Sequence, residues 1–366
     1  MGNGLISYLV IISFSFLMVL LAIPSIIHIA EKNLLFDSNE VERKNHRHGI
    51  SRLGGTAIFC SLILTTSLFH DFVDTNVSNY LLAAFILIFA VGLKDDLWGV
   101  NTSTKFFMQM LAALTIVVLA NIRITNMHGI ANIGILPYWA SVVFTTLLII
   151  FITNSFNLID GVDGLVGATS LLTSVIFGFL FAYMNEYNYV CIAFTLTGAS
   201  LGFLRYNLSP ARIFMGDAGS MLIGLVFSIL AIRFLELNIE NSGSPVYFAS
   251  APALAIAFLI GPIFDSTRVF IIRLINKRSP FVADNNHTHH RLVRYGFNHR
   301  QTTFILISFN NLMGALVIYF RNMGNLILIS FLLVCCILFN VVLTLIINYK
   351  EGRVYRSIPI TKLVQP

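Results

Sequence analysis

The sequence predicts an all-α, polytopic integral membrane protein with about eleven transmembrane helices in a single domain, residues 1–366. Three observations predict this fold class. First, 57% of the residues are hydrophobic and only 11% are charged, whereas soluble domains carry about 25% charged residues. Second, the apolar residues form runs close to the roughly 20 residues that cross a bilayer as a helix. Third, the Lys and Arg residues concentrate between alternate runs, which is the positive-inside pattern.

Eleven apolar runs are the predicted spans. They lie near residues 5–29, 53–70, 79–94, 104–121, 137–156, 164–184, 188–205, 218–236, 248–272, 302–320 and 325–348. The first run has no basic segment before it and no small-residue cleavage site, so we expect it to be retained rather than removed as a signal peptide. Cys60, Cys191, Cys335 and Cys336 all lie inside apolar runs, without metal or disulfide spacing. We interpret them as small buried hydrophobic residues.

The placement of the basic residues predicts the topology. If the N-terminus lies outside, every one of the 23 Lys and Arg residues except Arg123, Arg233 and Arg321 falls on the inside. This asymmetry predicts an external N-terminus and a cytoplasmic C-terminus, as an odd number of spans requires. The net charge of +6 therefore reflects topology, and we expect no nucleic-acid partner.

The acidic residues gather on that same side. Asp95 and Asp96 end the third run, Asp160 and Asp163 lie between the fifth and sixth, Asp217 opens the eighth, and Asp265 follows Gly261-Pro262 in the inner half of the ninth. Carboxylates in apolar segments are costly and usually functional. A transporter needs them at mid-depth, whereas carboxylates at helix ends suit an enzyme that takes one substrate from water and the other from the lipid.

Two groups near the third and fourth runs can bind metal or phosphate. The adjacent carboxylates of Asp95 and Asp96 can hold a divalent cation or take a proton from a phosphate; a solvated helix end is the alternative. Lys105 and Gln109 lie four residues apart, so they share one helical face. The Lys105 ammonium can meet a phosphate there, unless it only extends to the membrane interface.

Residues 154–165 hold a more specific pattern. Asn154, Asn157 and Asp160 recur every third residue, so they can share a face at the inner end of the fifth run. Gly161 permits a tight turn after that run, which leaves Asp163 near a helix N-terminus. Amide and carboxylate oxygens are suitable ligands for a hard cation such as Mg²⁺. Helix capping is the alternative.

Residues 214–220 open the eighth run with a glycine-containing turn. Free N–H groups at a helix start bind phosphate, and Asp217 can bind phosphate through Mg²⁺. Phe214 can stack on a nucleobase. The alternatives are a helix N-cap for Asp217 and packing against lipid or the core for Phe214.

A histidine cluster lies in the inside loop 273–301. His287, His289, His290 and Arg291 together form a patch suited to phosphate or sugar. Zinc is less suitable, because no cysteine accompanies the cluster and one ion would use the neighbouring His289 and His290 awkwardly. A solvated loop is the remaining alternative.

These four motifs, in this order and on one side, resemble the polyprenyl-phosphate N-acetylhexosamine-1-phosphate transferases (glycosyltransferase family 4). The resemblance runs from about residue 43 to residue 300. Arg43-Lys44-Asn45-His46 and Arg52-Leu53-Gly54-Gly55 resemble the first inside loop of that family, although His48, Gly49 and Ser51 replace its usual prolines and glycine. The His-x-His-His-Arg-Leu form of the histidine loop is similar to the N-acetylglucosamine-1-phosphate branch and unlike the peptidoglycan enzyme.

The resemblance implies the reaction and its setting. A UDP-N-acetylhexosamine and polyprenyl (undecaprenyl) phosphate would give the diphospho-linked lipid sugar and UMP, at the inner (plasma) membrane of a bacterium. Such a reaction initiates cell-envelope polysaccharide synthesis. Mg²⁺ would be the cofactor, with Mn²⁺ as a substitute, and a homodimer is one arrangement that the resemblance allows.

The resemblance also implies roles for the site residues. Asn157 and Asp217 would hold Mg²⁺; Asp163 and Phe214 would face uracil; Asp95, Asp96 and Asp160 would be catalytic; Lys105, His287, His289, His290 and Arg291 would contact phosphate or sugar.

Two alternatives remain open. One is the peptidoglycan branch, a phospho-N-acetylmuramoyl-pentapeptide transferase, against which only the histidine loop and the first inside loop argue. The other is a transporter with ion-coupling carboxylates. Mid-membrane charges, an internal repeat or paired half-helices would favour a transporter, and the sequence shows none of them clearly.

Overall fold

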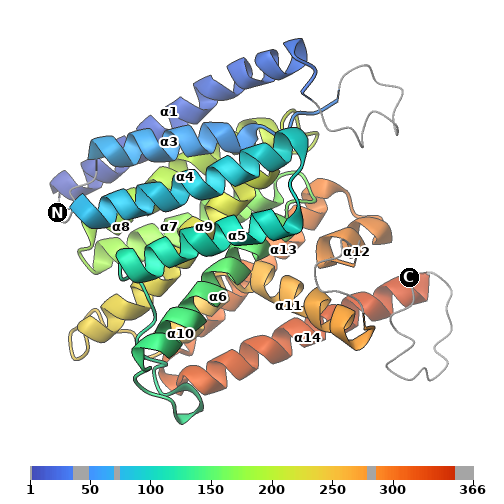
Figure 1. The fold of residues 1–366 in the computed structure, drawn as a ribbon. Coiled ribbons are helices and arrows are strands. Elements are labelled where there is room, and N and C mark those ends of the chain that lie inside the picture. The colour runs from blue at the N-terminus through green and yellow to red at the C-terminus, as the bar shows by residue number, and fades with distance from the viewer. Residues whose placement is uncertain (1, 36–48, 70–74, 278–285, 351–366) are drawn as a thin grey trace.

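The computed structural model describes residues 2–35, 49–69, 75–277 and 286–350 (Figure 1). The long helices are α1 (Gly2–Lys32), α3 (Gly54–Phe69), α4 (Thr75–Trp98), α5 (Thr102–Leu114), α6 (Tyr138–Leu158), α7 (Leu165–Tyr183), α8 (Tyr187–Asn207), α9 (Gly216–Glu240), α13 (His299–Tyr319) and α14 (Asn325–Lys350). Shorter helices are η1 (Thr115–Leu119), which continues α5, η2 (Ile130–Asn132), α10 (Ala251–Phe258), α11 (Ile260–Ile275), α12 (Thr288–Tyr295) and η3 (Arg321–Met323). The described part contains one isolated antiparallel bridge, Asn126–Ile135, and no strand. The all-α fold is therefore confirmed.

Each of the eleven predicted runs contains helix. Nine described helices are long and apolar enough to cross a membrane, and the bent pair α10–α11 would make a tenth. The remaining run, α3, is apolar but has only 16 residues. A multi-pass helical membrane protein is confirmed, and the count of eleven crossings stays a prediction.

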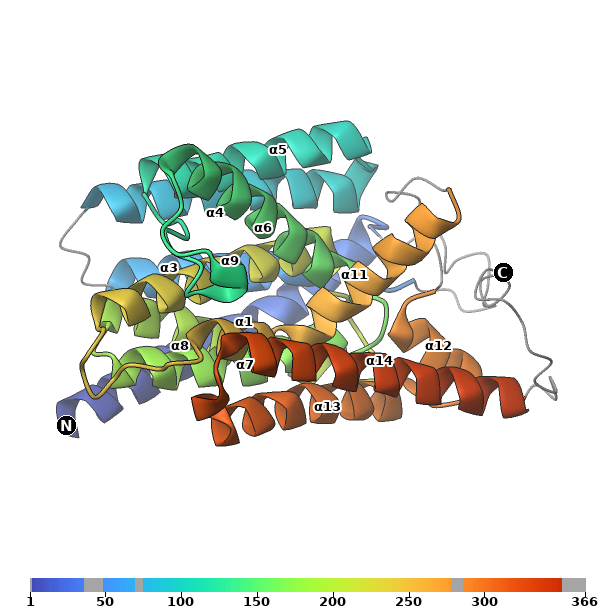
Figure 2. The same ribbon diagram turned by 90° about the horizontal axis from the view of Figure 1, so that it is seen from below.

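Helix α9 forms the centre of the bundle. It contacts α3, α4, α6, α7, α8 and α10, and nearly all of its residues are buried. Its sequence is apolar around most of its circumference, as expected for a helix enclosed on all sides. Figure 2 shows α4 and α5 along one edge of the bundle and α13 and α14 along the opposite edge.

The crossing of α3 and α9 depends on glycine. A Cβ atom added at Gly55 would lie 2.2 Å from the backbone nitrogen of Gly219. Small residues let membrane helices approach this closely. The short motif 52–55 is therefore anchored directly on the start of the central helix.

The predicted span 248–272 is not one helix. The structure breaks it at Leu259 into α10 and α11, which meet at an angle of 78° (Figure 1). The break precedes Gly261-Pro262, where the sequence predicts a distortion. Pro262 falls in the first turn of α11, where its missing N–H removes no helical hydrogen bond, so a new helix can start just before it.

A second correction concerns the inside loop 273–301. The structure forms the short helix α12 there, with His287 at its N-cap and Gly296 in the left-handed region (φ 113°) at its end. Thr288, His289 and Leu292 form its buried face. Eight residues are too few for hydrophobic periodicity to reveal a helix, particularly one whose buried face carries polar residues.

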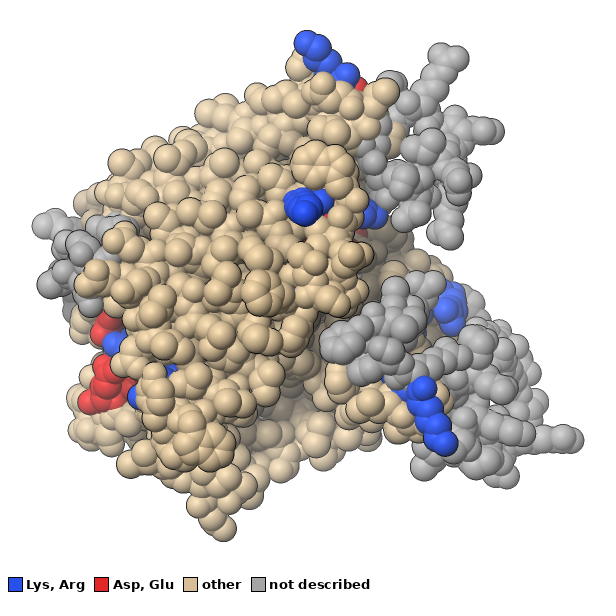
Figure 3. All heavy atoms as spheres, in the orientation of Figure 1, with Lys and Arg blue, Asp and Glu red and all other residues tan. Residues whose placement is uncertain are grey.

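Charges lie at the two ends of the bundle. Figure 3 shows a broad surface almost free of Asp, Glu, Lys and Arg, with charged atoms towards its edges. Basic residues of the predicted inside loops, such as Lys32, Lys94 and Arg205, lie at helix ends that share one end of the bundle. The motif Arg43-Lys44-Asn45-His46 and His48 lie outside the described residues. Among the cysteines, Cys191 and Cys336 are buried, Cys335 is partly exposed and Cys60 is exposed, so the interpretation that all four are buried is wrong for Cys60 and only partly right for Cys335.

Candidate active site

A cluster of charges forms where α4, α5, α6 and α9 end or begin together. The ammonium of Lys105 on α5 contacts Asp95 Oδ2 at 3.2 Å and also contacts Asp217 Oδ2. Asp95 is at the end of α4, and Asp217 is in the first turn of α9. Two carboxylates that are 122 positions apart in the chain therefore share one cation.

Asn157 completes the surroundings of Asp217. Its Nδ2 donates to Asp217 Oδ1 at 2.9 Å and to Ser220 Oγ at 3.1 Å. One turn earlier on α6, the carboxamides of Asn154 and Gln109 exchange hydrogen bonds of 2.7 and 3.2 Å. The shared face predicted for Lys105 and Gln109 is therefore confirmed, since both side chains reach this side of the bundle.

The donor set suits a hard cation. Asp217 and Asp95 supply carboxylate oxygens, and Asn157 supplies an amide oxygen once its amide turns over. No group of three or more His, Cys, Asp or Glu in the described part of the chain is arranged to hold a metal by itself. Mg²⁺ fits such a site, because it usually takes one or two carboxylates and completes its shell with water and substrate phosphates. The Lys105 ammonium already places positive charge between the carboxylates.

Asp96 has a different position from its neighbour. Its Oδ1 and Oδ2 accept from the backbone N–H groups of Asp217 (2.8 Å) and Ala218 (3.0 Å) at the start of α9. The expectation that these two N–H groups are free for phosphate is therefore wrong. A carboxylate here is favourable because it satisfies unpaired donors and faces the positive end of the helix.

Gly216 permits this arrangement. Its φ is +72°, and an added Cβ would lie 2.6 Å from Asp96 Oδ2 and 2.1 Å from the Arg52 carbonyl oxygen. A side chain at this position would therefore displace the carboxylate that holds the start of α9. The glycine is required both for the left-handed backbone and for the close approach.

Asp160 lies in the turn after α6, beside the same cluster. Burial of its carboxyl group, followed by the nearby charges of Asp217 and Asp96, raises the pKa of Asp160 to about 8. A hydrogen bond from the Gly216 backbone N–H acts in the opposite direction. At neutral pH this carboxyl group therefore holds a proton until positive charge arrives beside it.

Asp163 is held by a residue that the sequence pattern did not single out. His299 Nδ1, at the start of α13, lies 3.2 Å from Asp163 Oδ1, and the Ala211 N–H donates to Asp163 Oδ2 at 3.2 Å. Burial acts to raise the pKa of Asp163, but the hydrogen bond and charge of His299 outweigh it, and the pKa is lowered. His299 lies in a polar segment at a helix start, so nothing in its spacing marked it as a partner of Asp163.

Phe214 sits where the first inside loop meets the start of α9. Its backbone N–H donates to Ser51 O at 2.8 Å, and its carbonyl accepts from Gly54 N at 3.0 Å. The ring is partly exposed. The segments 51–55 and 214–216 are thus joined by backbone hydrogen bonds, which the sequence did not indicate.

Helix α12 carries the histidine cluster, and this histidine helix is anchored by Asp265 on α11. Asp265 Oδ2 lies 2.9 Å from His287 Nδ1, and Asp265 Oδ1 accepts from the backbone N–H (2.8 Å) and hydroxyl (2.5 Å) of Thr288. Arg268 contacts the same carboxylate at 3.3 Å. Asp265 was grouped with the other acids by its side of the membrane, and the structure shows that it positions α12.

His289 brings the histidine helix into contact with the turn at Gly161, next to Asp160. It is 1% exposed, and neither ring nitrogen has a hydrogen-bond partner in the described part of the chain. A Cβ added at Gly161 would lie 2.6 Å from His289 Nε2 and 3.2 Å from His290 Cε1. Burial, and then the neighbouring His290, lower the pKa of His289 to about 3, so its ring is neutral. Both rings therefore pack on the turn that carries Asp160.

Arg291 faces away from the cluster. Its Nη1 donates to Asn340 Oδ1 at 3.1 Å, and its Nη2 donates to Thr344 Oγ1, both on α14. Burial, and then the charge of Arg268, lower the pKa of Arg291 to about 10. The predicted phosphate patch is therefore divided: the histidines lie against Gly161, and the guanidinium lies against the last helix.

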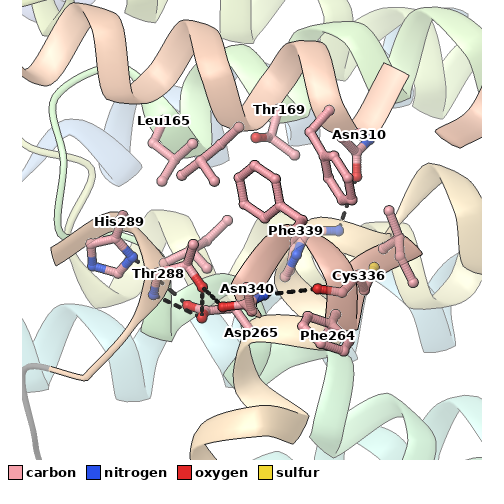
Figure 4. A pocket seen from close by; sticks show the side chains of 16 residues that line it. Leu165, Thr169, Phe264, Asp265, Thr288, His289, Asn310, Cys336, Phe339 and Asn340 are labelled. Carbon is pink, nitrogen blue, oxygen red and sulfur yellow. Dashed lines mark hydrogen bonds and ion pairs between the residues drawn. The ribbon is translucent and has the colours of Figure 1, made fainter. Parts of the chain in front are cut away.

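A pocket lies between α12 and the neighbouring helices. It has an empty volume of about 550 Å³ and is lined mainly by apolar side chains of α7, α11, α13 and α14 (Figure 4). Its polar lining residues are Thr169, Asp265, Thr288, His289, Asn310 and Asn340. The pocket therefore adjoins the histidine helix at Thr288 and His289.

Comparison with known proteins supports one family. The model of glycosyl transferase family 4 matches residues 78–235. The chain is 29% identical over 342 residues to a probable undecaprenyl-phosphate N-acetylglucosaminyl 1-phosphate transferase of Bacillus subtilis, covering 92% of each chain.

Two further relatives are similar over most of their length. A decaprenyl-phosphate N-acetylglucosaminephosphotransferase of Mycolicibacterium smegmatis is 32% identical over 286 residues, covering 72% of this chain and 70% of the relative. An undecaprenyl-phosphate alpha-N-acetylglucosaminyl 1-phosphate transferase of Escherichia coli K12 is 28% identical over 271 residues, covering 73% and 71%.

Proposed function

The chain belongs to glycosyl transferase family 4, and we propose that it transfers N-acetylglucosamine 1-phosphate from UDP-N-acetylglucosamine to undecaprenyl phosphate, with release of UMP. The names of the three relatives all describe transfer of N-acetylglucosamine phosphate, and all name a polyprenyl phosphate. Glycosyl-1-phosphate transfer is thus the activity of the family as these relatives represent it.

One observation supports this function most strongly. The turn at Asp160, the start of α9 at Asp217, the end of α4 at Asp95 and the histidine helix meet at one end of the bundle, although they come from distant parts of the sequence. Charged groups thus concentrate where the helices end. A nucleotide from water and a lipid phosphate from the bilayer can both reach such a place.

The proposed reaction requires little covalent help from the protein. An oxygen of the lipid phosphate attacks the sugar-linked phosphorus, the bond from that phosphorus to the bridging oxygen breaks, and UMP leaves. Reactions of this type depend on positioning and on neutralising negative charge. Asp95, beside Lys105, would orient the lipid phosphate or take a proton from it.

The other side chains would bind the donor. Lys105 would leave Asp217 to contact a phosphate, while His287, His289 and His290 would line the sugar-phosphate side. Asp163 and Phe214 would receive the uracil ring.

We also propose Mg²⁺ as the cofactor, with Mn²⁺ as a substitute. Asn157 and Asp217 would hold it, because the two side chains are already in contact and the Asn157 amide, once turned over, would present its oxygen beside the Asp217 carboxylate. When bound, the metal would neutralise charge on the diphosphate and on the departing UMP.

Asp217→Asn keeps the shape of the side chain and removes its charge, so activity should fall at least about 100-fold and recover in part with excess Mg²⁺.

The test uses purified protein in detergent or nanodiscs. UMP release should require UDP-N-acetylglucosamine, undecaprenyl phosphate and Mg²⁺ together, and EDTA should stop it. UDP-N-acetylmuramoyl-pentapeptide, the donor of the peptidoglycan branch, should give no UMP. No release with any UDP-sugar would exclude the proposed function, and equal activity in EDTA would exclude the metal.

A further inference from the structure

Asn340 is a buried polar residue in an otherwise apolar helix. It belongs to α14, whose mean hydropathy of 3.1 is the highest among the described candidate spans. Asn340 is nevertheless 9% exposed and lines the pocket beside α12 (Figure 4). A carboxamide in this environment is costly unless its hydrogen bonds are made.

Its hydrogen bonds lead to the histidine helix. Asn340 Nδ2 donates to the Cys336 carbonyl on its own helix at 3.1 Å, which orients the carboxamide. Its Oδ1 then accepts from Arg291 Nη1 at 3.1 Å, while the second arm of the guanidinium reaches Thr344. Asn340 and Thr344 are one turn apart on α14, and together they accept hydrogen bonds from both terminal nitrogens of the Arg291 guanidinium.

A second contact is weaker. Thr288 Oγ1 lies 3.4 Å from Asn340 Oδ1 but only 2.5 Å from Asp265 Oδ1. The hydroxyl has a single proton, which goes to the nearer acceptor. The link between α12 and α14 therefore depends on Arg291, whereas the link between α12 and α11 depends on Asp265.

We propose that Asn340, together with Thr344, is a positioning residue for the transferase: by holding Arg291 it fixes α12, so that His289 and His290 stay against the turn at Gly161. The eight residues of α12 are too few to form a stable helix alone. Asp265 holds only the first turn, around His287 and Thr288. Arg291 lies about one turn after Thr288 on α12, and its guanidinium donates a hydrogen bond to Asn340 on α14.

Helix α14 carries none of the four motifs, yet through Arg291 it would affect turnover. This inference rests on the proposed function, because α12 matters for turnover only if its histidines face the donor. Asn340 touches no reacting atom. A shift of α12 would move His289 and His290 together, since both rings pack on the same glycine.

The test compares Asn340→Leu, Arg291→Met and the double variant. Leucine suits an apolar helix, so Asn340→Leu should fold. Its kcat should fall roughly 10- to 100-fold, as expected when reacting groups are misplaced by about 1 Å. Because Asn340 acts through Arg291, the double variant should be no worse than the more impaired single variant. Asn238→Leu is the matched control. Asn238 is also buried, but its side chain hydrogen-bonds to the backbone N–H and carbonyl of Phe248, away from α12.

Hydrogen–deuterium exchange gives a readout that is independent of activity. Asn340→Leu should raise exchange in residues 288–295, and Asn238→Leu should not. Unchanged exchange in α12 of Asn340→Leu would overturn the proposal. A wild-type kcat in Asn340→Leu would also overturn it, and so would a double variant whose loss of kcat equals the product of the two single losses. Failure of the proposed function is seen separately, as absence of UMP release by the wild type.

Discussion

At Lys105, one ammonium group satisfies two carboxylates. Its contacts with Asp95 and Asp217 keep a pair of negative charges compatible at the helix ends. A divalent cation bound at Asp217 has to displace that ammonium or share the carboxylate with it. Lys105 and the proposed metal would therefore compete for the same oxygens, and the released ammonium would become available to a phosphate.

Lys105→Met should bind metal more tightly in the absence of substrate while losing transferase activity. Removing the competing charge should raise the affinity for Mn²⁺ by about tenfold or more. Titration followed by electron paramagnetic resonance, without nucleotide, measures this directly. Lys94→Met is the control, because Lys94 is exposed near the end of α4. Unchanged or weaker Mn²⁺ binding by Lys105→Met would show that the two cations do not compete.

Asp163 gives a pH dependence with a defined sign. Its pKa is lowered in the folded protein, against the effect of burial, by His299 and the Ala211 N–H. The stabilisation is therefore complete above the unfolded pKa of about 4 and is lost as the pH falls through the lower folded value. Wild type should melt at a higher temperature than Asp163→Asn at pH 6 to 7, and the gap should close towards about pH 3. A gap independent of pH would contradict the charge-based account.

The start of helix α9 is held by a side chain from another helix. Asp96 reaches it from α4 and accepts the N–H groups of Asp217 and Ala218. The side chain that forms the proposed metal site thus projects from a helix end that another helix holds in place. Asp95 and Asp96 are neighbours in sequence, yet one faces a cation and the other holds a backbone.

Asp96→Ala should lower stability by about 1–3 kcal/mol, the cost of leaving buried donors unpaired. Asp96→Asn keeps one acceptor oxygen and should be intermediate. Thermal melting in detergent ranks the three proteins, and Mn²⁺ titration should show weaker binding in the order of the stability loss, because Asp217 is no longer held. If Asp96→Ala melts at the wild-type temperature, Asp96 does not hold the start of α9.

The break between α10 and α11 determines where Asp265 lies. It turns α11 by 78° and brings Asp265 to the start of α12. The sequence indicates a distortion at Gly261-Pro262, but proline is tolerated in a first turn, so it does not show which side of the proline the helix ends on. The apolar residues on both sides continue without interruption, which is why a single span over 248–272 was predicted.

For the whole molecule, the arrangement predicts one topology. The proposed site lies at the end of the bundle where most basic residues gather, which the positive-inside rule assigns to the cytoplasm. Single cysteines in 157–163, 206–217 and 286–301, in a protein without native cysteines, should resist impermeant thiol reagents in intact cells. Cysteines in 122–136 and 237–247 should react and serve as the control. Labelling of 286–301 from outside would contradict both the topology and a cytoplasmic site.

The amino-acid sequence was sufficient for the features that depend on composition and order. Apolar runs that cross a bilayer have few solutions other than helices, because no water is available there and every backbone group must be satisfied internally. The all-α fold and the gathering of Asp95, Asp160 and Asp217 at helix ends follow from this constraint. The pairing of Lys105 with Gln109 on one face follows from helical periodicity.

The partners of individual side chains depended on tertiary packing. Asp96 on the start of α9, His299 on Asp163 and Asn340 on Arg291 each join residues from 49 to 136 positions apart. A carboxylate or amide at a helix end has several possible partners, and the spacing within its own helix does not distinguish them. The choice is made when helices pack, because glycines such as Gly55 and Gly216 set how closely the backbones approach and therefore which polar groups come within hydrogen-bonding distance.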